Sequence, residues 1–312
     1  MLNELNRKLF TLNQLKGVGP ATLEKLVAMP IFASASVSDL AKSNSKLAKA
    51  LERPGAWEDA VRSAEAEMET CIRLGVRIVC TLDEEYPQLL RGTPDRPFFL
   101  YVLGHWSKMP LRSVAVIGTR EPTDHGKVVA ERITEYLVDD GWSIVSGLAL
   151  GCDAVAHQRA LDRGGHTIAV LAHGLHTVAP KQNHDLARRI VDNGGALVTE
   201  YGFGVEPFGP QFVKRDRIQA GLARGVIMIQ SDQQGGSLHA SRAAVAYQRL
   251  LAVPCPTERD IASREKKIEA NLILSGESIE AKSKLLNCLD SDLKYLFIIR
   301  GRDDYQRLSI AL

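Results

Sequence analysis

Several short segments of this sequence place glycine next to hydroxyl or basic side chains directly after an apolar run. Three of them are Gly118-Thr119-Arg120, the loop from Ser146 to Gly151, and Gly235-Gly236-Ser237. Glycine lets the backbone approach a ligand closely, and the free N–H groups at the start of a helix attract negative charge. Arginine adds a planar, bidentate grip on phosphate. These residue types therefore predict the binding of phosphate groups.

A basic cluster follows at Lys214, Arg215 and Arg217, and phenylalanines lie upstream of it at positions 203, 208 and 212. Basic side chains along a phosphate backbone, beside aromatic faces on which bases stack, are typical of single-strand binding. An exposed, charged start of a helix would give the same pattern. Lys181 opens another helical segment, from which it can reach a phosphate on the same side of the fold.

The common cofactor and metal signatures are not present in the sequence. It has neither the GxGxxG dinucleotide motif nor a Walker A loop, so no cofactor is predicted. His173, His176 and His184 lack a ligand spacing such as HExxH, so no metal site is predicted either. The candidate phosphate- or DNA-binding residues are therefore Gly118, Thr119, Arg120, Ser146, Gly147, Gly151, Lys181, Lys214, Arg215, Arg217, Gly235, Gly236 and Ser237.

The elements that must position these residues have the pattern of a doubly wound sheet. Apolar runs typical of buried parallel strands occur at 114–117, 143–145, 167–171, 196–199, 226–229 and 251–253. Helical patterns separate most of these runs, and parallel strands need crossover helices. The predicted fold class is thus α/β, an extended Rossmann-like, mostly parallel doubly wound sheet. Ligands bind such sheets at the carboxyl ends of the strands, where the glycine turns lie.

Three parts are predicted along the chain. Residues 1–75 form a small all-helical N-terminal domain, in which Gly17-Val18-Gly19 joins two helical stretches in the manner of a helix-hairpin-helix motif. Residues 76–280 form the Rossmann-like core. Residues 281–312 form a short C-terminal segment of unassigned role, and an apolar run at 293–299 suits an extra strand.

The composition limits the class of protein. The formal net charge is only +2, so binding to a nucleic acid would require a local basic patch. The 5 cysteines are scattered and show no CxxC spacing, which argues against a disulfide framework and fits a reducing compartment. No stretch approaches the roughly 20 apolar residues of a membrane span. We therefore expect a cytoplasmic protein with no membrane association.

Several of these segments, taken in order, resemble the DprA/Smf family of DNA-processing proteins. They include GTR at 118–120, SGLALGCDAVAH at 146–157, KRDRIQAGL at 214–222 and GGSLHA at 235–240. The resemblance implies a Rossmann-like core that binds single-stranded DNA, forms a homodimer and loads a RecA-type recombinase during natural transformation and recombination. It implies no hydrolytic activity. The basic candidates named above correspond to the family's DNA contacts, and the glycines correspond to its anion-binding turns.

The sequence also departs from this family pattern. Asp216 stands where the family usually has asparagine, and His173 stands where small residues are usual, so a bulky imidazole is expected to narrow the pocket. Residues 254–256 replace a usual glycine, and a C-terminal winged helix is not evident. These departures leave open a divergent paralogue in a mobile-element or defence setting.

The alternative function is that of a nucleotide-binding sensor or phosphoribohydrolase of the related lysine-decarboxylase-like (LOG) group. The same glycine turns suit one mononucleotide as well as a strand. Enzymes of that group resemble PGGxGTxxE at the last of these turns, whereas QGGSLHASR at 234–242 lacks the acidic residue. Glu200 is then the remaining candidate for a catalytic base.

Overall fold

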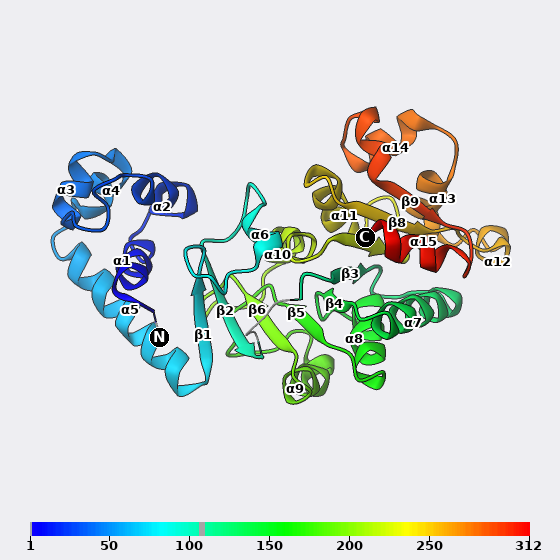
Figure 1. Ribbon diagram of the computed structural model, residues 1–312, viewed down its shortest axis with the longest axis horizontal. Helices are drawn as coiled ribbons and strands as arrows, with labels where there is room; N and C mark the ends of the chain where they lie inside the picture. The colour runs from blue at the N-terminus through cyan, green and yellow to red at the C-terminus, as the bar shows by residue number, and fades with distance from the viewer. Residues whose placement is uncertain (1, 106–109) are drawn as a thin grey trace. The chain divides into compact units, whose positions relative to one another are not determined.

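The computed structural model describes residues 2–105 and 110–312. The chain divides into two compact units, which are described separately (Figure 1). The first unit comprises Met1–Tyr86 and Pro97–Val102, and the second comprises Pro87–Arg96 and Leu103–Leu312.

The first unit is mainly helical and includes the blue helices of Figure 1. Its elements are α1 (Glu4–Asn13), α2 (Pro20–Val27), α3 (Val37–Lys42), α4 (Ser45–Leu51), α5 (Ala56–Arg73), β1 (Val76–Cys80) and the start of β2 (Phe99–Gly104). The unit therefore extends beyond residue 75 to take in β1. Phe10 of α1 packs edge-on against Phe99, with the ring centroids 5.2 Å apart. The turn at 17–19 joins α1 to α2, and a DNA contact there remains a prediction.

The second unit is built on a parallel sheet. Its strands lie in the order β6 (Ala196–Thr199), β5 (Thr167–Val170), β4 (Ser143–Ser146), β3 (Ser113–Ile117), β7 (Gly225–Met228), β8 (Leu250–Pro254) and β9 (Leu296–Ile299). Every neighbouring pair among them is parallel. All the residues of β3 to β7 are buried, because helices cover both faces of the sheet. The predicted α/β, mostly parallel fold class is confirmed, and β9 is the extra strand expected at 293–299.

Helices cover this sheet on both sides (Figure 1). One face packs against α7 (Asp124–Asp139), α8 (Cys152–Asp162), α9 (His184–Asp192) and α15 (Asp304–Ala311), and the other packs against α10 (Gly209–Gly221) and α11 (Ser237–Ala246). The shorter helices of the unit are α6 (Gln88–Arg91), α12 (Glu258–Ala262), α13 (Glu269–Ser275) and α14 (Ile279–Leu286). Three-residue 3-10 turns at Lys181–Asn183 and Lys266–Ile268 and a longer one at Asp290–Tyr295 complete it.

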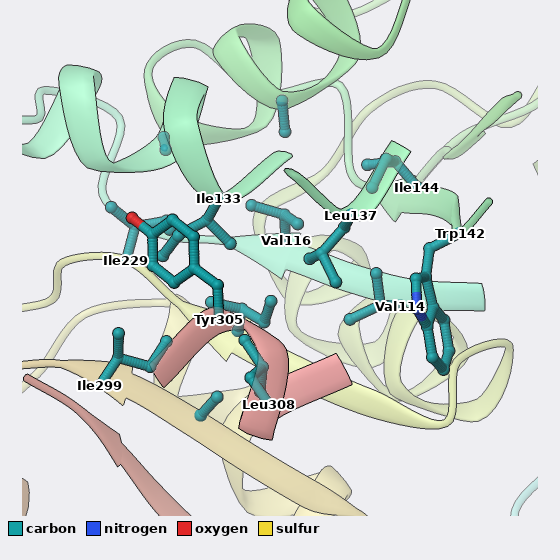
Figure 2. Packing of buried hydrophobic residues seen from close by; sticks show 14 of the residues in the cluster. Val114, Val116, Ile133, Leu137, Trp142, Ile144, Ile229, Ile299, Tyr305 and Leu308 are labelled. Atoms are coloured by element: carbon teal, nitrogen blue, oxygen red, sulfur yellow. The ribbon is translucent and has the colours of Figure 1, made fainter. Parts of the chain in front are cut away.

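The C-terminal segment completes the hydrophobic core of the second unit. Figure 2 shows Tyr305 and Leu308 of α15 among side chains of the sheet and α7, including Ile133. Trp142 belongs to the same cluster, and its indole N–H donates to the Ser309 hydroxyl (2.9 Å). Burial of these apolar groups ties the end of the chain to the sheet. In the described part of the chain, none of the helices combines the length and the apolar character needed to cross a membrane.

The strand order places a topological switch point between β3 and β7. The chain runs outward from β3 through β4, β5 and β6, and then returns to place β7 on the other side of β3. Ala115 pairs with Val226 in this register, so the carboxyl ends of β3 and β7 lie together. In open parallel sheets, the crevice outside the carboxyl ends of the strands at a switch point is the usual place for a ligand.

Candidate functional site

A cavity of about 490 Å3 lies at this switch point. The turn after β3 contributes Gly118, Thr119 and Arg120, and the turn that leads into α11 contributes Gly235, Gly236 and Ser237. Besides these two turns, α10 lines the cavity with Phe212, Arg215, Asp216 and Gln219. Seven of the predicted site residues therefore line one cavity.

Two of the predicted glycines allow close packing beneath the cavity. Gly151 precedes α8 with φ 77° and ψ −128°, and a Cβ there would lie 2.5 Å from the carbonyl carbon of Arg120. The next residue, Cys152, donates its backbone N–H to the Thr119 carbonyl (3.1 Å). A Cβ on Gly147 would lie 2.6 Å from Cζ of Arg215. These glycines therefore let the loop between β4 and α8 pack against the turn at 118–120 and against α10.

Arg215 is buried, with 4% of its side chain exposed. One terminal nitrogen donates to the Gly147 carbonyl (2.8 Å) and also to the Val170 carbonyl, at the ends of β4 and β5. Its Nε donates to Asp216 Oδ1 (3.1 Å). Two of the three guanidinium nitrogens thus have protein partners, so Arg215 acts mainly as a buried positive charge in the cavity lining.

Asp153 holds the loop between β4 and α8. Its carboxylate accepts hydrogen bonds from the N–H groups of Gly147 (3.0 Å) and Ala149 (3.4 Å). Burial raises the pKa of Asp153, while the Arg215 charge acts in the opposite direction. Ser146 has a comparable structural contact, since its hydroxyl donates to the Val116 carbonyl (2.6 Å).

The rest of the basic cluster lies outside this cavity lining. Arg217 forms a bidentate pair with Glu200, at 2.8 and 2.9 Å, and only 15% of the Arg217 side chain is exposed. Lys214 lies 3.4 Å from the same carboxylate and is 58% exposed. Lys214 is therefore the member of the cluster whose charge faces solvent.

Lys181 lies in a different depression of the second unit. It lines an open groove of about 690 Å3 together with His176, His184 and Arg188. His173 lines neither depression, because it is buried and its Nε2 accepts the backbone N–H of Ala179 (3.2 Å). The narrowing of the cavity expected from this imidazole is therefore not seen. Among the described residues, no group of three or more metal-ligand side chains is placed to hold a metal ion.

Gln219 is a cavity residue that the sequence reasoning did not single out. It is 2% exposed, and its Nε2 donates to Asp216 Oδ1 (2.8 Å). Its spacing from Arg215 and Asp216 could have indicated this position, since residues three and four apart share one face of a helix. Phe212 lies one further turn away on the same face.

The contribution of Asp216 to stability should fall as the pH rises toward neutrality. Burial raises the pKa of this carboxyl from 3.8 to about 7, the Arg215 charge opposes the rise, and Asp153 adds to it. Between these values the folded state keeps a proton that the unfolded state has released, so unfolding becomes easier as pH rises. The Asp216 contribution to the free energy of unfolding should fall by at most about 1.4 kcal/mol per pH unit over this range. Burial lowers the pKa of His157 to about 3, so this histidine contributes with the opposite sign over much of the same range.

Urea unfolding at a series of pH values measures this dependence. The free energy of unfolding of the wild type minus that of Asp216→Asn should fall between pH 4 and 7, because the amide has no proton to lose in that range. The attribution to Asp216 is wrong if the variant keeps the wild-type slope.

The sheet and its cavity place this chain in the class of Rossmann-like proteins, which bind phosphate-bearing ligands at this edge. A model of the family described as DNA recombination-mediator protein A matches residues 77–284. The chain belongs to this family. It is 37% identical to protein Smf of Synechocystis over 212 residues. These aligned residues cover 66% of this chain and 52% of the relative.

Further relatives and solved structures agree with this assignment. Protein Smf of Escherichia coli is 38% identical over 55% of this chain and 46% of its own length. The chain thus spans about half the length of these two curated relatives. DNA processing protein A from Streptococcus pneumoniae has the same fold, with a TM-score of 0.69, 24% identity, and coverage of 88% of this chain and 98% of that one.

A second solved structure is of a relative described as a DNA-binding protein. It is DNA processing protein A from Helicobacter pylori, described for its single-stranded DNA binding mode. The match has a TM-score of 0.59 and 26% identity, and it covers 75% of this chain and 94% of that one.

Proposed function

We propose that this chain is a single-stranded DNA-binding protein that acts in DNA processing. The observation that carries the proposal is the position of Arg120. Its side chain is exposed beside the glycine turn at the cavity, and it has no carboxylate partner among the described residues. The N-terminus of α11 opens into the same cavity and favours an anion. The single-stranded DNA binding described for the Helicobacter pylori relative supports the same ligand.

Further phosphates of the strand would meet basic groups outside the cavity. Lys214 is exposed on α10, and Lys181 lies in its own groove with Arg188. In this arrangement Arg215 and Gly151 support the site from within, while Arg120 and the exposed lysines contact the strand. Contacts of this kind carry little sequence information, because they are made to the sugar–phosphate backbone.

We further propose that the protein acts in the cytoplasm as a homodimer and loads a RecA-type recombinase on single strands taken up or exposed for recombination. Family membership supports this assignment. Recombinase filament formation on strands covered by a single-strand binding protein tests it. The purified chain should speed filament formation, and no effect at saturating concentration would contradict loading.

The proposed role does not require catalysis by this chain. The base considered for mononucleotide hydrolysis, Glu200, is 8% exposed and is held by Arg217 and Lys214. It does not line the cavity. Its geometry therefore gives no support to a hydrolase in which Glu200 activates water.

Binding should be tested by fluorescence anisotropy with labelled thymidine oligomers of several lengths, as single strands and as duplexes with their complements. We expect tighter binding to the single strands and a linear fall of log affinity with log salt concentration. Affinity that depends on neither strand length nor salt would contradict the proposal.

Arg120→Ala should weaken strand binding about equally for all sequences and reduce the salt slope by about 0.7, the value for one phosphate contact in a single strand. Thr119→Ala, in the same turn, should have a smaller effect, because a neutral hydroxyl offers a phosphate one hydrogen bond and no charge. The charge-matched control is Arg307→Ala, an exposed arginine of α15 outside the cavity lining. Equal losses in Arg120→Ala and Arg307→Ala would show a general charge effect.

A further inference from the structure

The cavity lining carries groups of both charges. The turns at 118–120 and 235–237 offer Arg120 and the N-terminus of α11, both of which favour an anion. The α10 wall presents the Asp216 carboxyl beside the buried Arg215 guanidinium, and Asp232 of the turn after β7 also lines the cavity. An ionised carboxyl there repels phosphate and attracts N–H donors. The cavity therefore suits a ligand that combines an anion with hydrogen-bond donors.

Asp216 has one oxygen available for such a ligand. Its Oδ1 accepts hydrogen bonds from Arg215 Nε (3.1 Å) and Gln219 Nε2 (2.8 Å). Its Oδ2 accepts none from the described residues, although the side chain is 13% exposed and lines the cavity. The two bonds to Oδ1 hold the carboxyl in place, so the direction of Oδ2 is set before a ligand arrives.

Gln219 supplies a second acceptor beside it. The bond from Nε2 to Asp216 fixes the orientation of the amide, because the carboxylate can only accept. The Oε1 atom of Gln219 is then a buried acceptor with no hydrogen-bond partner among the described residues. Buried polar atoms are nearly always hydrogen-bonded, so an unpaired acceptor in a cavity lining indicates that a ligand donor is expected there.

We propose that this cavity binds one nucleotide of the strand and prefers guanine, with the phosphate at the glycine turns and the base edge at Asp216 and Gln219. Guanine presents N1–H and the N2 amino group side by side, and two adjacent donors match two acceptors. Adenine and cytosine place an acceptor next to their amino group, and thymine places one N–H between two carbonyls. Phe212 lines the same cavity, and the guanidinium groups of Arg120 and Arg215 lie 5.7 and 6.0 Å from the centroid of its ring.

This proposal rests on the proposed strand binding and adds base selectivity at a single position. A cavity of about 490 Å3 is in the range that proteins use for one small ligand, so the remaining nucleotides would follow the open surface outside it. The preference should therefore depend on one guanine in a strand, and additional guanines should add little.

The test uses thymidine oligomers in which one central residue is replaced by guanine, hypoxanthine, adenine or cytosine. Competition anisotropy at pH 8, where Asp216 is mostly ionised, measures their affinities. The guanine oligomer should bind at least about fivefold more tightly than the all-thymidine oligomer, as expected for a two-donor base contact. Hypoxanthine lacks the N2 amino group and keeps N1–H, so its oligomer should bind with intermediate affinity. This comparison requires no variant and so does not depend on whether a substitution folds.

Asp216→Asn identifies the side chain responsible. The amide presents N–H donors where the carboxylate could only accept, so on this variant the guanine oligomer should lose its advantage over the all-thymidine oligomer. The matched control is Asp124→Asn, which removes a fully exposed carboxylate and should keep the preference.

The two proposals fail in different ways. Wild-type protein that binds all the oligomers equally overturns the guanine preference and leaves strand binding supported. The same is true if Asp216→Asn keeps the full preference. If no oligomer binds in a salt-dependent way, strand binding is wrong and the guanine site is wrong with it.

Discussion

Gly151→Ala is expected to destabilise the protein by about 3–5 kcal/mol and to abolish strand binding. The backbone at this residue has φ 77° and ψ −128°, a conformation that is essentially restricted to glycine. The added Cβ would also lie 2.5 Å from the carbonyl carbon and oxygen of Arg120. Relief of that overlap requires movement of the backbone turn that carries Arg120, so stability and binding should fall together.

The matched control is Gly164→Ala, at the other end of α8. Gly164 also has a positive φ, of 67°, but a Cβ there meets no atom within 4 Å. Gly164→Ala should lower the free energy of unfolding only through backbone strain, by about 1–2 kcal/mol, and should leave strand affinity unchanged. Urea unfolding and anisotropy with a thymidine oligomer measure both quantities. If the two variants behave alike, contact between the Gly151 loop and the Arg120 turn does not determine the site.

Arg215→Ala should lower the free energy of unfolding by about 3–5 kcal/mol, because removal of one partner leaves buried charge without compensation. Asp153 and Asp216 both interact with this guanidinium, and the carbonyls of Gly147 and Val170 would lose their donor. A lysine ammonium cannot reproduce the planar guanidinium, which donates to Asp216 and to the carbonyls of Gly147 and Val170. Arg215→Lys should therefore restore little of the stability.

Urea unfolding at pH 8 tests this result, and Lys214→Ala is the control on the next residue. Because Lys214 is 58% exposed, its removal should leave stability nearly unchanged and reduce strand affinity instead. The opposite outcome, a stable Arg215→Ala protein with a smaller salt slope, would make Arg215 a direct phosphate contact, as the sequence pattern first suggested.

The fold class was predictable because the relevant information is local. Continuous apolar runs such as 114–117 and 226–229 form strands buried on both faces, and the intervening helical patterns impose parallel crossovers. Glycine turns after strands necessarily lie at the carboxyl edge of a parallel sheet. The gathering of Gly118 and Gly235 at that edge could therefore be anticipated.

The roles within the basic cluster could not be predicted from adjacency in sequence. Lys214, Arg215 and Arg217 look like one patch in the sequence, but successive residues of a helix point about 100° apart. In the structure Arg215 is buried in the cavity lining, Arg217 pairs with Glu200, and Lys214 is exposed to solvent. In the sequence, Asp216 is an acidic residue among predicted phosphate contacts. In the structure, α10 places it in the cavity lining.

The sequence by itself determined the parallel sheet and the glycine turns at its carboxyl edge, since each depends on residues close together in the chain. Phosphate binding by those turns stays a prediction. Only the tertiary structure decided which turns meet. The residues after β3 and those after β7 are more than 100 positions apart, and they share a cavity because the strand order reverses between these two strands. Strand order and helix rotation arise from packing across the whole core, so they determine which side chains bind a ligand and which support the site from within.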